Sequence, residues 1–301
     1  MRASANGTFL HTRRFLNYHK DRFEDVSMVV RDADGRIRAV FPAAMDASDP
    51  TRAISHPGAT FGGLVTDPGV TGDAYRDLFE AVLEAYAALG LATIAYRAVP
   101  AAYHVVPAEE DLYWLWRLGG TLESRQLSAC VDLKKRRKRR IREYARSEAV
   151  CELRSGARYL PELWAVVEAT LRARHGTGPV HDVGEIVELA SAFPDEIETL
   201  VALSGRRVVG GAVLFCSTNV VHMQYGISSP EGMALHSADL LVRRSIEIAR
   251  ERGARYFDFG ISTDRDGTGL NEGLHRFKMK TGAGTIVYER YGLDVRRGGT
   301  A

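Results

Sequence analysis

The sequence predicts an α+β protein made of two tandem domains of one type, each a mixed central sheet flanked by helices. The main observation is a repeated order of elements: each half of the chain shows a hairpin, a helix, a glycine that ends the helix, and a buried strand. The helix-ending glycines, Gly90 and Gly253, correspond to each other. A chain of 301 residues is long enough for two domains of roughly 150 residues. The alternative is one mixed domain in which the repetition is a coincidence.

In the first half, apolar runs on both sides of an aspartate- and glycine-containing turn at 32–35 indicate a hairpin. Apolar and aromatic side chains then recur at helical spacing, and Gly90 suits the left-handed residue that commonly ends a helix. The expected hairpin, helix and strand lie at 26–41, 75–86 and 91–96. We expect the N-terminal domain to span residues 1–131.

In the second half, a turn at 204–207 separates two apolar runs and again indicates a hairpin. An amphipathic helix is expected before it, at 160–174. The expected hairpin, strand, helix and strand lie at 200–215, 220–226, 238–249 and 254–260. We expect the C-terminal domain to span residues 148–301.

A strongly basic segment lies between the two domains and is expected to form a connecting helix over 132–147. Residues 134–146 contain nine basic groups and one acid, a charge of +8, so the rest of this chain of net charge +2 carries −6. Because so many positive charges repel one another and cannot all be buried, the segment needs full solvation or an anionic partner. A phosphate-rich ligand would bind there in a salt-dependent manner.

The composition is that of an ordinary globular protein, with 45% hydrophobic and 26% charged residues. No apolar run approaches the ~18 residues that span a bilayer, and the N-terminus shows no apolar signal core. The three cysteines are odd in number and widely spaced, which fits neither a disulfide framework nor a metal knuckle. We therefore expect a cytoplasmic protein without a membrane span.

The segment richest in candidate functional residues lies near the end of the chain. A buried strand carries Asp258 among aromatic residues and stops at Gly260. A loop rich in polar residues follows, from Ser262 to Asn271, and a short helix then places Lys278 behind Phe277. A buried strand followed by such a loop is a common way for a rigid scaffold to present polar groups to a ligand.

Two of these segments, Phe-Asp-Phe-Gly at 257–260 and Phe-Lys at 277–278, resemble motifs of the GNAT acyltransferase superfamily, specifically its Fem-type branch. That branch transfers acyl or aminoacyl groups. The segments His-Pro-Gly at 56–58 and Arg-His-Gly-Thr at 174–177 are similar to segments of bacterial Fem-like proteins from polysaccharide loci. The resemblance implies two tandem GNAT-type domains. It departs from the family pattern at Thr281, where an aromatic residue is usual.

The resemblance places the lysine at the position of Lys278 near the reacting carbonyl. A fixed cation there would stabilise the negative charge that develops on the carbonyl oxygen when an amine attacks. The reaction also needs a base, and His222 and Asp258 are the candidates on the two central strands. The alternative for each is a hydrogen-bonded structural role.

A GNAT-type domain binds its donor where two central strands part, and a helix N-terminus then receives a pyrophosphate. Strand alternation places His222 and Gln224 on one face of the first strand, and Met223 and Tyr225 on the other. We expect Gln224 and Tyr225 to contact the donor.

The loop after that strand retains part of the GNAT pattern, because Gly232 and Ala234 match it. Ser229 replaces the usual Gln or Arg, and Glu231 stands where an anion would approach. Fem-type members take the acyl group from aminoacyl-tRNA instead of coenzyme A. The basic segment resembles their basic helix, so its arginines are expected to contact the donor, in particular Arg137 and Arg140.

For the acceptor, the resemblance points to Arg174 and His175, and the polar loop adds Ser262 and Asn271. His175 and His181 lack the spacing and partners of a metal site, so we expect no metal and no bound cofactor.

The function expected from the sequence is acyl or aminoacyl transfer to an amine or hydroxyl acceptor by direct attack. Aminoacyl-tRNA is the favoured co-substrate, which would make tRNA a partner, and acyl-coenzyme A is close behind. The acceptor is expected to be a small molecule or a cell-wall or polysaccharide precursor. Two alternatives remain: an ordinary acyl-coenzyme A-dependent GNAT N-acetyltransferase, and a non-catalytic module that binds RNA or another polyanion.

Overall fold

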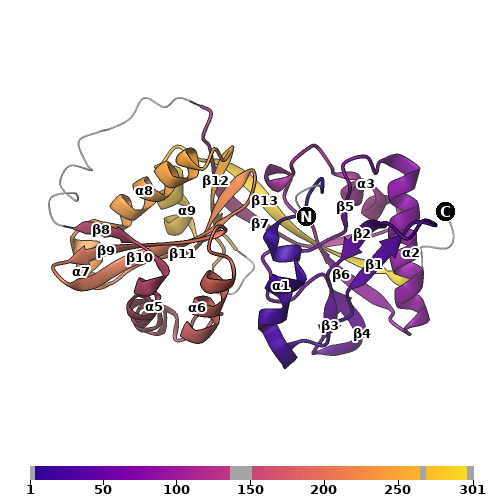
Figure 1. Ribbon diagram of the computed structural model, residues 1–301, viewed down its shortest axis with the longest axis horizontal. Helices are drawn as coiled ribbons and strands as arrows, with labels where there is room; N and C mark the ends of the chain where they lie inside the picture. Colours follow the sequence, from indigo (N-terminus) through magenta and orange to yellow (C-terminus); the bar gives the residue numbers. More distant parts are fainter. Residues whose placement is uncertain (1–3, 136–150, 265–268, 297–301) are drawn as a thin grey trace. The chain divides into compact units, whose positions relative to one another are not determined.

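A computed structural model describes residues 4–135, 151–264 and 269–296 (Figure 1). The chain divides into two compact units. Unit 1 is Met1–Leu127 together with Ile286–Ala301, and unit 2 is Ser128–Thr285. Each unit has a sheet with parallel and antiparallel pairs and helices packed against it, so the expected fold class, two tandem α+β domains, is confirmed.

The described residues of unit 1 form two groups of strands and several helices. The strands β1, β2 and β5 form one sheet, and β3, β4, β6 and β13 follow one another in a second. The strands are β1 (Met28–Arg31), β2 (Ile37–Phe41), β3 (Ala44–Asp46), β4 (Asp49–Ile54), β5 (Val65–Thr66), β6 (Thr93–Arg97) and β13 (Gly284–Asp294). The helices are α1 (Arg13–Leu16), α2 (Gly72–Ala88) and α3 (Glu110–Arg117), with 3-10 helices η1 (Phe9–His11), η2 (Asn17–Arg22) and η3 (Ala101–Tyr103).

The core of unit 1 forms between α2 and the strands, as the helical spacing of apolar residues predicted. The face of α2 that carries Tyr75, Phe79 and Leu83 is buried against the side chains of the strands. The helix ends before Gly90, whose φ of +82° lies in the left-handed region that favours glycine. The hairpin expected at 26–41 is present as the antiparallel pair of β1 and β2.

In the described part of unit 2 the strands follow one another in the order β7-β12-β11-β10-β9-β8. The strands are β7 (Thr121–Asp132), β8 (Glu152–Ser155), β9 (Ile197–Ser204), β10 (Arg207–Cys216), β11 (Val220–Ser228) and β12 (Tyr256–Ile261). The helices are α5 (Leu160–His175), α6 (Val183–Ala192), α7 (Pro230–Ala234), α8 (Ser237–Glu251) and α9 (Glu272–Met279), with the 3-10 helix η4 (Ala157–Tyr159).

Helices cover both faces of the sheet in unit 2 (Figure 1). The apolar face of α8 packs on one side and forms the core with residues such as Leu214 and Phe257. On the other side, α5 approaches β10 at Gly211, where an added Cβ would lie 2.6 Å from a methyl group of Leu163. The glycine therefore permits this close packing of helix on strand.

The predicted domain boundaries differ from the observed division. The end of β7 belongs to unit 2, and most of β13 belongs to unit 1. In unit 2, residues 128–132 of β7 pair with β12, and in unit 1, residues 290–294 of β13 pair with β6. The last described strand thus lies in unit 1, although the sequence assigned it to a domain over 148–301. Most of the expected connecting helix, 136–147, lies outside the described residues.

The two units repeat one local arrangement, as expected. In each unit a parallel strand pair is preceded by a helix and a glycine with positive φ, +82° at Gly90 and +74° at Gly253. The parallel pairing covers three residue pairs in both units and ends at corresponding positions. It ends at Ile54↔Ala95 in unit 1 and at His222↔Asp258 in unit 2, five residues after the glycine in each case.

A buried carboxyl group in unit 1 generates a prediction about pH and stability. Asp111, in the first turn of α3, is buried and accepts a 2.9 Å hydrogen bond from the Tyr96 hydroxyl. Burial raises the pKa of Asp111 to about 7. Because this folded-state pKa lies above the ordinary value of 3.8, the folded protein binds the proton more tightly, and stability falls as pH rises from about 4 to about 7.

We expect Asp111→Asn to flatten the fall in melting temperature of the full chain between pH 4 and pH 8. At 1.36 kcal/mol per pKa unit, the difference in pH dependence between the two proteins is on the order of 4 kcal/mol. Thermal unfolding of wild type and variant in the same buffers measures it. Parallel curves for the two proteins would show that Asp111 does not titrate in this range.

Candidate functional site

The candidate site lies where β11 and β12 part. In the described chain their pairing runs from Val220↔Tyr256 to His222↔Asp258 and extends no further, although both strands continue. Strand backbone beyond such a point has amide and carbonyl groups that are not used in pairing between the two strands. The last pair of the ladder consists of an imidazole and a carboxyl group, and both are buried.

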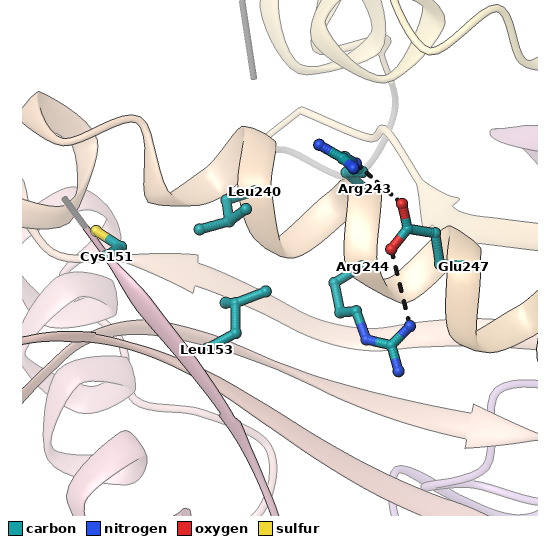
Figure 2. A pocket seen from close by; sticks show the side chains of 6 residues that line it. All are labelled: Cys151, Leu153, Leu240, Arg243, Arg244 and Glu247. Atoms are coloured by element: carbon teal, nitrogen blue, oxygen red, sulfur yellow. Dashed lines mark hydrogen bonds and ion pairs between the residues drawn. The ribbon is translucent and has the colours of Figure 1, made fainter. Parts of the chain in front are cut away.

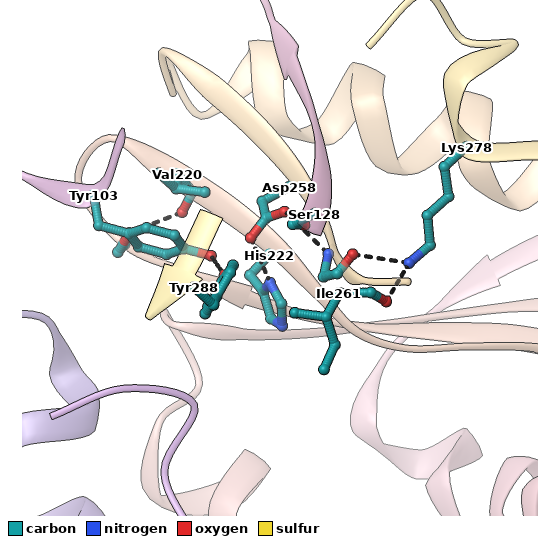
Figure 3. A network of polar contacts seen from close by, with 10 residues as sticks. Tyr103, Ser128, Val220, His222, Asp258, Ile261, Lys278 and Tyr288 are labelled. Carbon is teal, nitrogen blue, oxygen red and sulfur yellow. Dashed lines mark hydrogen bonds and ion pairs between the residues drawn. The ribbon is translucent and has the colours of Figure 1, made fainter. Parts of the chain in front are cut away.

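The Asp258 carboxyl group is the centre of a hydrogen-bonded cluster (Figure 3). Its Oδ2 lies 3.1 Å from Nδ1 of His222, and its Oδ1 accepts hydrogen bonds from the Ser128 hydroxyl at 2.5 Å and the Gly260 amide at 3.0 Å. With two donors on Oδ1, the carboxyl group acts as an acceptor, and the Nδ1 of His222 then carries the proton. In that tautomer Nε2 is the basic nitrogen of the ring.

Gly260 allows the imidazole to lie close to the strand. Its φ is +74°, and an added Cβ would stand 3.1 Å from Cε1 of His222. The β12 ladder also shifts register between Asp258 and Ile261. A side chain at this position would strain the backbone and displace the ring. This explains why the Phe-Asp-Phe-Gly segment ends in glycine.

Lys278, on α9, reaches back to the same strand (Figure 3). Its Nζ donates hydrogen bonds to the backbone carbonyls of Gly260 at 2.8 Å and Ile261 at 2.7 Å. Burial lowers the pKa of Lys278 to about 8, and the charge of Asp258 opposes this shift. The lysine thus fixes the backbone that follows Asp258 and adds a buried cation beside the carboxylate.

The expected alternation of side chains along β11 is wrong at Gln224. Met223 lies opposite Leu214 of β10 and Tyr225 lies opposite Val213, which leaves Gln224 as the extra residue of a β-bulge. The bulge restores Tyr225 to the face that carries His222. The Gln224 side-chain oxygen is buried and has no hydrogen-bond partner among the described residues.

On that face, Tyr225 contacts the helices α5 and α6 and the loop between them. Its hydroxyl lies 2.7 Å from Nδ1 of His181, and its ring lies 4.9 Å from that of Trp164. Burial raises the pKa of Tyr225 to about 12, so the hydroxyl keeps its proton at neutral pH. Tyr225 is therefore an uncharged side chain next to the point where β11 and β12 part.

The predicted donor loop folds as the short helix α7, whose first turn is closed by groups of this chain. The Ser229 hydroxyl accepts a 3.0 Å hydrogen bond from the amide of Gly232. Gly232 itself packs so tightly that an added Cβ would lie 2.2 Å from the carbonyl oxygen of Val209. The Glu231 carboxylate pairs with Arg207 at 2.9 Å. Ala234 is the last residue of the helix.

The predicted acceptor residues lie on two segments. Arg174 is exposed in the last turn of α5, and the next residue of that helix is His175. Ser262 is fully buried after β12, and its hydroxyl has no partner among the described residues. Asn271 caps α9 by accepting a hydrogen bond from the amide of Leu274 at 3.0 Å.

The structure brings together the three predicted catalytic residues, and the sequence reasoning missed one neighbour. Lys278, His222 and Asp258 form one cluster, whereas Arg137 and Arg140 lie outside the described residues. The missed residue, Ser128, is on β7 and is distant in sequence from the rest of the cluster. No local pattern around Ser128 distinguishes it from other strand serines.

Unit 1 lacks this chemistry at the corresponding place. The pair equivalent to His222↔Asp258 is Ile54↔Ala95, which has no titratable group. Beyond that pair, a loop of the protein itself bonds to the end of β6. The Ser55 hydroxyl accepts a hydrogen bond from the amide of Arg97 at 2.7 Å, and the amide of Gly62 donates to the carbonyl of Arg97 at 3.1 Å. The candidate catalytic groups therefore belong to unit 2.

A groove on the other side of unit 2 is a weaker candidate (Figure 2). Its volume is about 260 Å³, and it is lined by Cys151, Leu153, Leu240, Arg243, Arg244 and Glu247. Arg243 pairs with Glu247 at 2.9 Å, and Arg244 bonds Glu251. Since each arginine has a carboxylate partner, the groove presents little net charge to a ligand.

Two other features of the described chain bear on ligands and location. No three metal-binding side chains of the His, Cys, Asp or Glu type gather within the ranges 4–135, 151–264 and 269–296. Within the same ranges, no helix has the length and apolar character needed to cross a membrane.

Comparisons with known proteins show what the chain is similar to. Residues 132–278 match the family model Acetyltransf_6, described as an acetyltransferase (GNAT) domain. A search of curated proteins finds no match. The fold is similar to that of FemX, with 14% identity, a TM-score of 0.69, and coverage of 96% of this chain and 93% of FemX.

Two further structures have similar folds. L-PGS from Bacillus licheniformis matches with 14% identity and a TM-score of 0.60, over 89% of this chain and 83% of that one. The tandem GNAT protein of clavulanic acid biosynthesis, in a structure without AcCoA, matches with 11% identity and a TM-score of 0.54, over 91% and 85%. At these identities the similarity is one of fold. The fold that the resemblance implies, tandem domains of the GNAT type, is confirmed.

The role of Gly260 can be tested against a matched glycine of the same unit. Gly253 has the same φ of +74°, but an added Cβ there would meet no atom within 4 Å. We expect Gly253→Ala and Gly260→Ala both to lower the melting temperature, since each strains a left-handed residue by roughly 1 kcal/mol. Only Gly260→Ala should also lower the rate of acyl transfer, because it alone displaces His222. Equal rates in the two variants would contradict the assigned role.

The buried cation of Lys278 gives a second prediction. Because its pKa is about 8, a reaction that needs the charged lysine should slow as pH rises above 8. Lys278→Met should lower the rate about 100-fold below pH 8, and the difference from wild type should shrink as pH rises above 8. Lys278→Arg, which stays charged, should lose the alkaline decline. The control is Lys280→Met at the exposed neighbouring lysine, which should transfer at the wild-type rate.

Proposed function

We propose that this GNAT-type acyltransferase transfers an aminoacyl or acyl group to an amine or hydroxyl acceptor by direct attack, with aminoacyl-tRNA as the favoured donor. The observation that carries the proposal is the buried His222–Asp258 pair at the point where β11 and β12 part, with Lys278 beside it. A base held by a carboxylate next to a cation meets the chemical needs of acyl transfer.

In the proposed reaction, the acceptor nitrogen or oxygen forms a bond to the donor's carbonyl carbon, and the donor's ester or thioester bond breaks. Nε2 of His222 takes the proton of the attacking group, and Asp258 stabilises the resulting imidazolium. The imidazolium then returns the proton to the leaving hydroxyl or thiol, so that protons balance over one turnover. The positive charge of Lys278 lies next to this pair and favours the negative charge that develops during attack.

Three features favour aminoacyl-tRNA over acyl-coenzyme A. The amide of Gly232, which would have to receive a pyrophosphate, is already bonded to Ser229. The first turns of α7 and α8 contain the acids Glu231 and Asp239, which stabilise the helix ends and repel a phosphate group. The basic segment at 134–146, by contrast, has the charge that a polyphosphate ligand requires.

For the acceptor we propose a small molecule or a cell-wall or polysaccharide precursor that carries an amine or hydroxyl group. Arg174 and His175, at the end of α5, are the proposed contacts to it, because the loop after them leads to His181 and Tyr225 beside the site. We also propose that the protein acts in the cytoplasm, where charged tRNA is available.

The decisive experiment measures donor consumption by the full chain with a panel of amine and hydroxyl acceptors. Radiolabelled acetyl-coenzyme A and a charged tRNA pool are offered in parallel, each with and without ribonuclease. Ribonuclease-sensitive transfer supports the favoured donor. Transfer from acetyl-coenzyme A that ribonuclease does not affect overturns the proposed donor and supports an ordinary GNAT N-acetyltransferase.

The same assay separates catalysis from simple binding. We expect His222→Ala to lower transfer by about 100-fold or more while the protein still binds the donor, since it loses only the base. The matched control is Ile54→Ala, at the equivalent position of unit 1, which should keep the wild-type rate. If the protein binds tRNA but no donor is consumed with any acceptor of the panel, the result favours the alternative of an RNA-binding module.

A further inference from the structure

We propose that Ser128 is a positioning residue that sets both the orientation and the strength of the His222 base through its hydrogen bond to Asp258. This inference rests on the proposed function, because it concerns the same base. The hydroxyl of Ser128 lies 2.5 Å from Oδ1 of Asp258, and both side chains are fully buried.

The direction of this hydrogen bond follows from the rest of the cluster. An ionised carboxylate only accepts, so the Ser128 hydroxyl must donate. Oδ1 thus receives two donors, from Ser128 on β7 and from the amide of Gly260 on β12, while Oδ2 remains for His222 on β11. Three neighbouring strands therefore fix the plane of the carboxylate, and that plane fixes the imidazole.

The register of the strands shows that this serine belongs to the unit with the base. On β7, Cys130 lies opposite Asp258, and Ser128 is two residues further along on the same face. In unit 1 the equivalent of Cys130 is Gly292, which lies opposite Ala95, and the residue two positions away is Arg290. Where the carboxylate is absent, the serine is absent as well.

The hydrogen bond also has an electrostatic effect on the base. A donor on Oδ1 draws negative charge away from Oδ2 and so weakens the attraction between Asp258 and a protonated His222. Without the serine, the carboxylate holds the imidazolium more strongly, and the ring gives up its proton only at higher pH. The carboxylate would also lose one of the donors that hold its plane, so the ring would spend less time in the productive orientation.

Other titratable groups near the pair do not change in this comparison. They are Cys130 on β7, Lys278 on α9, and Tyr225 with His181 on the face of β11 that carries His222. Burial raises the pKa of the Cys130 thiol, and Asp258 adds to the shift, so this thiol stays neutral. A shift caused by replacing Ser128 would therefore report on the Asp258–His222 pair.

The test compares Ser128→Ala with Ser128→Thr, which keeps the hydroxyl, and with Ser245→Ala as a matched control. Ser245 is a fully buried serine of the same unit, and its hydroxyl has no partner among the described residues. We expect Ser128→Ala to lower kcat about 10- to 100-fold, with little change in KM, and to move the acid limb of the pH–rate profile to higher pH by about half a unit. Ser128→Thr should restore much of the loss, and Ser245→Ala should match wild type.

A second readout does not depend on activity. The imidazole signals of His222, assigned by comparison with His222→Gln, are followed by NMR as a function of pH in wild type and in Ser128→Ala. We expect the ring to titrate at higher pH in the variant. If the ring shows this shift but no acyl transfer is detected, the result supports the role of Ser128 and counts against the proposed function. Unchanged titration and an unchanged pH–rate profile, in an enzyme whose transfer requires His222, would overturn the role of Ser128.

Discussion

The hydrogen bond between Asp258 and His222 is the interaction on which the candidate site depends. A buried carboxylate is costly unless donors surround it, and here three strands supply them. The same bond marks the last residue pair before β11 and β12 part. Two requirements meet at one point: the sheet needs a satisfied polar pair at the end of its ladder, and the proposed reaction needs an oriented base where β11 and β12 no longer pair with each other. Lys278 completes the arrangement by bonding the carbonyls that follow Asp258.

The comparison of the two units shows why the candidate site lies in unit 2. Both have a helix, a left-handed glycine and a short parallel strand pair in the same register. In unit 1 the last pair is Ile54 and Ala95, and the chain itself bonds to the strand end through Ser55. A repeated fold therefore provides the scaffold twice, while the residues proposed for acid–base chemistry lie in the described part of unit 2. The two units thus share a fold but not the candidate site.

The sequence predicted the features that depend on local pattern. Gly90 and Gly253 ended helices as expected, and the candidate residues Asp258 and Lys278 came from short segments whose composition is distinctive. The failures have a different physical origin. The pairing of β13 with β6 is a long-range contact that no local pattern specifies, so the domain boundaries were misplaced. The β-bulge at Gln224 does not contain the glycine that often marks a bulge in a sequence. The prediction therefore assumed strict alternation of side chains along β11.

The central claim is that the donor binds in unit 2 where β11 and β12 part. Hydrogen–deuterium exchange of the full chain tests it most directly, without and with a saturating concentration of the donor that the wild-type protein consumes. We predict slower exchange in the part of β11 beyond the pair, 223–228, and in 259–263, with no change in the corresponding segment of unit 1, 55–63. Protection confined to 55–63, or none in 223–228 at saturating donor, would contradict this account.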